Sequence, residues 1–89
     1  MKILIVEDDT VLNQTLAFNL KMAGYQVISA YTMEQARGEL TGSRFDLAVL
    51  DVNLPDGSGY DLCKLIKPEH PDTVVIFLTA NDQESDQLR

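Results

Sequence analysis

The sequence predicts an α/β fold in which helices cover both faces of a parallel β-sheet. Three short segments, 3–6, 45–50 and 74–78, are almost entirely apolar. They lack the polar alternation of a half-exposed strand, which is the pattern of parallel strands buried on both faces. Segments with helical periodicity separate these runs. Strands that alternate with helices in this way favour right-handed crossovers and a parallel sheet.

The first strand is predicted over residues 2–6, and Asp9 or Thr10 can cap the helix that follows. Gly24 stands where that helix needs a left-handed residue to end. The apolar residues of the helix recur at helical spacing, whereas several polar residues lie off their face. The apolar set is Leu12, Leu16, Leu20 and Ala23, and the polar set is Asn13, Gln14 and Lys21.

Tyr25–Ala30 alternates loosely and is predicted to be the second strand. Thr32 and Gln35 have the spacing of a capping box, which starts a second helix. That helix is expected to stop near Gly42, and the third strand is predicted over 45–50.

The segment 51–57 contains proline and glycine and is predicted to be a loop. A third helix follows, and we expect Pro68 and Pro71 to end it. The fourth strand is predicted over 73–78, and Asn81 then caps a further short helix. The apolar positions of the third helix are Tyr60, Leu62, Leu65 and Ile66.

The composition excludes several functional classes. The 89 residues suffice for one domain, 1–89, and a formal net charge of −7 disfavours direct binding of nucleic acid. The single cysteine, Cys63, excludes an internal disulfide and is expected to be a buried, inert thiol. No apolar stretch approaches the length of a membrane span, and the N-terminus does not resemble a signal peptide. We therefore expect a soluble cytoplasmic protein.

Oxygen-bearing side chains follow the predicted strands directly. Glu7, Asp8 and Asp9 follow the first strand, Asp51 follows the third and Thr79 the fourth. The carboxyl edge of an open α/β sheet is where ligands bind. If the first and third strands are neighbours, Glu7 or Asp8 approaches Asp51 there. Close carboxylates raise one another's pKa unless a cation intervenes, and Mg²⁺ prefers such oxygen ligands. The alternative is that Asp8 and Asp9 only cap a helix, although a cap needs one acid.

Other chemistries fit the residues less well. A calcium loop that starts at Asp51 would need glycine and glutamate where Asp56 and Leu62 stand. A phosphatase with Asp51 as nucleophile would want a second aspartate at the position of Asn53. His70 lies between prolines in a loop and is expected to be solvated rather than a ligand.

Three motifs at these separations resemble the response-regulator receiver domain of two-component signalling. They are residues 3–9, Asp51 with the segment 54–59, and residues 78–80. The resemblance implies a flavodoxin-like (CheY-like) fold with strand order 2-1-3-4-5. The segment 56–59 resembles regulators that carry a winged-helix DNA-binding domain, which implies transcription regulation by the full-length parent.

The resemblance also implies roles for individual residues. Asp51 would accept a phosphoryl group from a phosphohistidine on a sensor histidine kinase, as a signalling switch rather than a turnover enzyme. Glu7 and Asp8 match the acidic pair that holds Mg²⁺ together with Asp51, and the backbone carbonyl of Asn53 matches the third protein ligand. Thr79 matches the switch hydroxyl.

The chain departs from the family's pattern after the expected fourth helix. The family continues with a fifth strand, which starts with a lysine that pairs with the phosphoryl group, and with a fifth helix. This sequence stops at Arg89, so we expect a C-terminally incomplete receiver domain with impaired phosphorylation. The alternative is a fragment that acts only as an interaction or oligomerisation module. It would self-associate through the exposed fourth strand, 74–78, or through exchanged elements.

Overall fold

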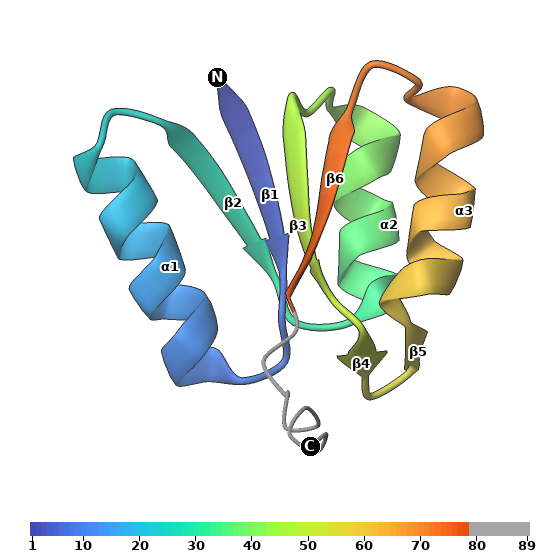
Figure 1. The fold of residues 1–89 in the computed structure, drawn as a ribbon, viewed down its shortest axis with the longest axis horizontal. Coiled ribbons are helices and arrows are strands. Elements are labelled where there is room, and N and C mark those ends of the chain that lie inside the picture. The colour runs from blue at the N-terminus through green and yellow to red at the C-terminus, as the bar shows by residue number, and fades with distance from the viewer. Residues whose placement is uncertain (79–89) are drawn as a thin grey trace, which may run out of the picture.

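The predicted parallel sheet is confirmed in the computed structural model, which describes residues 1–78. Four strands pair in parallel in the order β2-β1-β3-β6, so the first strand in the sequence lies inside the sheet. Their carboxyl ends meet at one edge (Figure 1). The strands are β1 (Lys2–Val6), β2 (Gln26–Ala30), β3 (Leu47–Asp51) and β6 (Val74–Leu78).

Helices cover both faces of the sheet, as the sequence predicts. One helix, α1 (Thr10–Met22), lies on one face, and α2 (Met33–Gly42) and α3 (Gly59–Glu69) lie on the other (Figure 1). Two short strands, β4 (Asn53–Leu54) and β5 (Gly57–Ser58), form an antiparallel hairpin where the sequence predicts a loop over 51–57, and the hairpin extends one residue beyond it. None of the helices within residues 1–78 combines the length and apolarity needed to cross a membrane.

The core explains why β1 shows no polar alternation. Ile3 and Ile5 pack in the layer beneath α1, and Leu4 and Val6 pack in the layer beneath α2 and α3. All four side chains are at most 1% exposed. Because the two faces of the strand are both buried, every residue from 3 to 6 must be apolar.

The predicted helix starts are confirmed by their hydrogen bonds. The Asp9 carboxylate accepts from the Leu12 N–H at 3.1 Å, and the Thr32 hydroxyl accepts from the Gln35 N–H at 3.1 Å. The Gln35 side chain accepts from the N–H of Tyr31, one residue before the partner that a capping box predicts. Gly24 ends α1 with a φ of 102°, which only glycine adopts without strain.

Two predicted boundaries are clearly wrong, whereas β2 and β6 each begin one residue later than predicted and β3 ends one residue later. Pro68 lies inside α3 rather than after it, because the helix continues to Glu69 and the His70 N–H donates to the Ile66 carbonyl at 2.7 Å. A proline near a helix end removes one hydrogen bond without breaking the preceding turns. The third strand begins at Leu47, two residues later than predicted. Phe45 is buried outside the strand, and its carbonyl accepts from the Thr73 hydroxyl at 2.7 Å.

Several side chains lie on faces other than those predicted. Asn13, assigned to the polar side of α1, is fully buried, whereas Tyr60 and Leu65 of α3 are 54% and 50% exposed. Cys63 is half-buried and packs against the core beneath α3. The short helix predicted to start at Asn81 lies outside the described residues.

Candidate functional site

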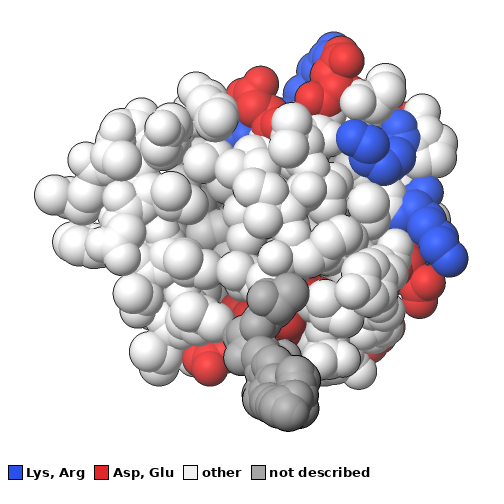
Figure 2. Space-filling model, viewed as in Figure 1, with Lys and Arg blue, Asp and Glu red and all other residues white. Residues whose placement is uncertain are grey.

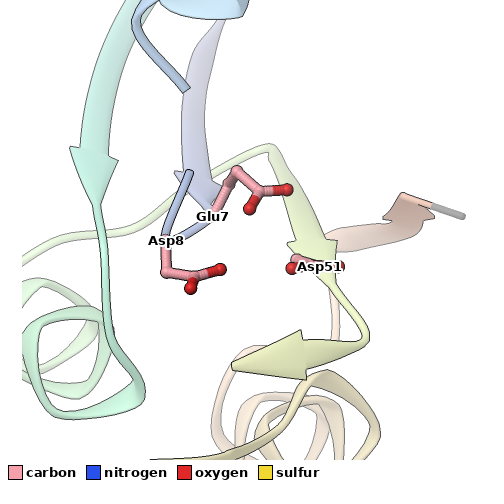
Figure 3. Close-up of side chains that lie close together, drawn as sticks. All are labelled: Glu7, Asp8 and Asp51. Atoms are coloured by element: carbon pink, nitrogen blue, oxygen red, sulfur yellow. The ribbon is translucent and has the colours of Figure 1, made fainter. Parts of the chain in front are cut away.

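Three carboxylates meet at the carboxyl edge of the sheet, as the sequence predicts. Glu7 and Asp8 follow β1, and Asp51 is the last residue of β3. The two strands are neighbours with Val6 opposite Leu50, so the residues that follow emerge side by side. One oxygen of each carboxylate lies within 4.8 Å of the others, and Figure 3 shows Glu7 and Asp8 directed toward Asp51.

A tight backbone turn surrounds Asp51. Its carboxylate accepts a long hydrogen bond of 3.4 Å from the Asn53 N–H, and the Gly59 N–H donates to the Val52 carbonyl at 2.8 Å. A Cβ atom at Gly59 would collide with the carbonyl oxygen of Asp51. Since that obstacle is backbone, only glycine lets α3 start so close to the end of β3.

Glu7 has an unusual protonation equilibrium. Burial raises its pKa from 4.5 to about 7, the hydrogen bond from the Asp9 N–H opposes the rise, and the charge of Asp51 adds to it. The Glu7 Oε2 accepts from the Asp9 N–H at 2.9 Å, and the residue is 3% exposed. A proton or a cation is therefore needed to balance this carboxylate at neutral pH.

The oxygen donors fit a divalent cation. Arg44 and Asp72 form an ion pair at 3.7 Å on the surface, and it is the only side-chain ion pair within residues 1–78. No described Lys or Arg therefore neutralises the carboxylate cluster. Three carboxylates are the ligand type that Mg²⁺ prefers. Asp9 does not join the cluster, because its carboxylate caps α1.

The structure says less about the two remaining predicted site residues, Asn53 and Thr79. Asn53 lies in β4, two residues after Asp51, and its N–H donates to the Asp51 carboxylate. Thr79 lies outside the described residues. It follows Leu78, which is opposite Asp51 in the pairing of β3 with β6.

Asn13 supports the site and was not predicted to do so. Its Nδ2 donates to the Glu7 carbonyl at 2.9 Å and to the Ala30 carbonyl at 3.0 Å. These bonds tie α1 to the carboxyl ends of β1 and β2 and hold the backbone of Glu7. The sequence signal is weak: Asn13 precedes the buried Ala17 by one helical turn, which places both on one face.

Curated proteins resemble the chain along nearly its whole length. It is 37% identical over 87 residues to the alkaline phosphatase synthesis transcriptional regulatory protein PhoP of Bacillus subtilis, covering 98% of this chain and 36% of that protein. It is 41% identical over 87 residues to the transcriptional regulatory protein CpxR of Escherichia coli, with 98% and 37% covered. The chain thus spans less than two fifths of the length of these relatives.

Solved structures show the same fold. The non-phosphorylated HemR receiver domain of Leptospira biflexa superposes with a TM-score of 0.78 at 38% identity, covering 97% of this chain and 71% of that chain. The response regulator TrrA of Thermotoga maritima, solved in complex with Mg(2+)-BeF, gives 0.84 at 29% identity, with 98% and 76% covered. The sequence profile of the response regulator receiver domain matches residues 3–89. The chain therefore belongs to the response regulator receiver domain family.

Proposed function

We propose that this receiver domain accepts a phosphoryl group on Asp51, with Mg²⁺ held by Glu7, Asp8, Asp51 and the backbone carbonyl of Asn53. The observation that carries the proposal is the convergence of three carboxylate oxygens within 4.8 Å. TrrA, a receiver of the same fold, was solved with Mg(2+)-BeF, and this supports the cation assignment.

The proposed step is a transfer between proteins. A carboxylate oxygen of Asp51 forms a new P–O bond while the P–N bond to the imidazole of a kinase phosphohistidine breaks, and the leaving nitrogen keeps the electron pair. Bound Mg²⁺ would neutralise the phosphoryl oxygens as charge develops. The product is an acyl phosphate on Asp51.

The chain's own residues prepare this step. The tight turn at Gly59 fixes the backbone of Asp51, and the Asn53 N–H holds one of its oxygens, which leaves the other available as the nucleophile. Asn13 holds the backbone of Glu7. We assign the switch hydroxyl to Thr79, because it directly follows the strand that pairs with Asp51.

The sensor histidine kinase is the proposed donor, and transcription is the proposed output of the parent protein. The supporting observation is that the curated relatives are named as transcriptional regulatory proteins. The output would require sequence beyond these 89 residues, since the relatives are more than twice as long.

The test is intact-mass spectrometry after treatment with acetyl phosphate and Mg²⁺. The wild-type chain should gain one phosphoryl group, and Asp51→Asn, which keeps the shape of the side chain, should gain none. Glu39→Gln, which removes an exposed carboxylate from α2, should be labelled as the wild type is. Labelling of Asp51→Asn to the wild-type level would contradict the assignment of the acceptor.

A second candidate function is self-association through the edge of the sheet. Within residues 1–78, β6 pairs with β3 on one side, and its Val74 and Ile76 are 58% and 49% exposed. Figure 2 shows few charged side chains over α1 and β6. An exposed apolar edge strand is a template for pairing with a second copy, directly or through exchanged elements.

Sedimentation velocity over a concentration series tests this second function. The wild-type chain should form dimers as the concentration rises, whereas Ile76→Lys should remain monomeric because it places a charge on the edge strand. Val11→Lys is the matched control, because Val11 is 74% exposed on α1, a helix that packs with β1 and β2 and not with the β6 edge. A wild-type chain that stays monomeric at the highest concentration would exclude this function.

A further inference from the structure

Asp56 joins two parts of the molecule that are distant in sequence. Its Oδ1 accepts from the Met33 N–H at 2.8 Å, and its Oδ2 accepts from the Glu34 N–H at 3.1 Å. These N–H groups belong to the first turn of α2, where backbone donors have no partner within the helix. The hydrogen bond from Met33 is the largest cause of the lowered pKa of Asp56, so its carboxylate stays charged at neutral pH.

Asp56 lies at the tip of the hairpin that follows Asp51. In that hairpin Asn53 is opposite Ser58, and Leu54 is opposite Gly57, which leaves Pro55 and Asp56 as the connection. The ionised tip therefore rests on the positive end of the helix dipole of α2, which adds to the hydrogen bonds.

Two further contacts seat the hairpin on α2. Leu54 is 8% exposed and belongs to the core beneath α2 and α3. A Cβ atom at Gly57 would collide with the sulfur of Met33, so the backbone of the hairpin passes directly against that side chain. The hairpin is thus anchored to α2 by a carboxylate, a buried leucine and a close backbone approach.

The other end of the hairpin reaches the proposed metal site. The Asn53 N–H donates to Asp51, and the Val52 carbonyl accepts from the Gly59 N–H. The carbonyl of Asn53 is the proposed backbone ligand, and no side-chain adjustment can compensate if that backbone moves.

We infer that Asp56 is a positioning residue for the proposed magnesium site. By fastening the hairpin to the first turn of α2, it holds the Asn53 backbone, which bonds to the Asp51 carboxylate and would supply the carbonyl ligand. This inference rests on the function proposed above. The simpler interpretation is that Asp56 only caps α2 and stabilises the fold. It predicts that removing Asp56 changes the Mg²⁺ affinity no more than removing any other cap of this helix does.

The variants separate these readings. Asp56→Ala removes both hydrogen bonds, and Asp56→Asn keeps one acceptor oxygen and removes the charge. Thr32→Ala removes the other cap of the same helix without touching the hairpin. Asp61→Asn removes an exposed carboxylate from the first turn of α3 and controls for charge alone.

Titration calorimetry with MgCl₂ on the 89-residue chain measures the affinity without any phosphodonor. Asp56→Ala should weaken Mg²⁺ binding about 10-fold, the order found for groups that orient a metal ligand, and Asp56→Asn should lie between it and the wild type. Thr32→Ala should lower the urea midpoint while its Mg²⁺ affinity stays within twofold of wild type, and Asp61→Asn should also stay within twofold.

Amide hydrogen exchange in EDTA supplies a readout that does not involve the metal. The Gly59 amide, which is bonded to the Val52 carbonyl, should exchange faster in Asp56→Asn than in Thr32→Ala. Asp56→Asn keeps the inference testable if Asp56→Ala does not fold.

If the wild type binds Mg²⁺ and both Asp56 variants bind it with the same affinity, the positioning role of Asp56 is overturned and the proposed function is not. Equal weakening in Thr32→Ala or Asp61→Asn would overturn it as well. A wild-type chain that binds no Mg²⁺ would overturn the proposed function and this inference with it.

Discussion

Replacing Glu7 by glutamine should stabilise the protein in the absence of divalent cations. The carboxylate is buried beside Asp51, and its pKa rises from 4.5 to about 7 because the folded state disfavours its charged form. Glutamine keeps an acceptor for the Asp9 N–H and removes that charge. The substitution therefore relieves an electrostatic cost while it preserves the local hydrogen bond.

The magnitude follows from the pKa. The rise from 4.5 to about 7 corresponds to about 3 kcal/mol, at about 1.4 kcal/mol per pKa unit. Solvent screens part of this electrostatic cost. We therefore expect Glu7→Gln to raise the free energy of unfolding by about 1–2 kcal/mol at pH 8. The pKa of Glu7 is higher in the folded state than in the unfolded state. Its contribution to the free energy of unfolding is therefore fully present below pH 4.5 and is lost as the pH rises through about 7.

The assay is urea unfolding followed by far-ultraviolet circular dichroism in EDTA, at about pH 5 and pH 8. Only the difference between variant and wild type is interpreted, because other acids titrate over the same range. The gain should be largest at pH 8 and mostly absent at pH 5, and Glu39→Gln should give no such pattern. A Glu7→Gln variant that is less stable than wild type at pH 8, or a gain equal at both pH values, would refute the electrostatic reasoning.

Three further outcomes are expected. Mg²⁺ affinity, measured by calorimetry, should rise with pH up to about 7 and then level off, because Glu7 must lose its proton to bind the cation; a flat profile would count against Glu7 as a ligand. Asn13→Ala should lower the free energy of unfolding by about 1–3 kcal/mol, because the carbonyls of Glu7 and Ala30 lose their buried donor; an unchanged urea midpoint would contradict this. Gly59→Ala should destabilise the chain and prevent labelling of Asp51, because its Cβ meets the Asp51 carbonyl; wild-type labelling would exclude that clash.

The strands and the helix starts were predictable because their signals are local. The continuous apolar run 3–6 indicates a strand buried on both faces, and Asp9 and Thr32 mark helix starts through hydrogen bonds to residues three positions away. Acids that directly follow parallel strands lie at one edge of the sheet, and Glu7, Asp8 and Asp51 meet there because β1 and β3 are neighbours, a strand order that the family resemblance implied.

Other boundaries and faces could not be predicted, because they depend on what packs nearby. Pro68 signals a helix end, yet α3 continues past it to Glu69, because a proline this near the end removes one hydrogen bond and leaves the turns before it intact. Asn13 is polar and was assigned to the outside, yet its side chain donates to two strand-end carbonyls in the core. For Asn13, tertiary hydrogen bonds outweigh the local preference of a polar side chain for solvent.

The sequence by itself determined which side chains are available at the site, and the tertiary structure decided how strongly they act on one another. Burial is the largest cause of the raised pKa of Glu7, and the extent of that burial cannot be read from the order of residues. The bond from Asp56 to the start of α2 joins positions more than twenty residues apart. Burial and distance arise only when the strands and helices pack, and electrostatic energies depend on both.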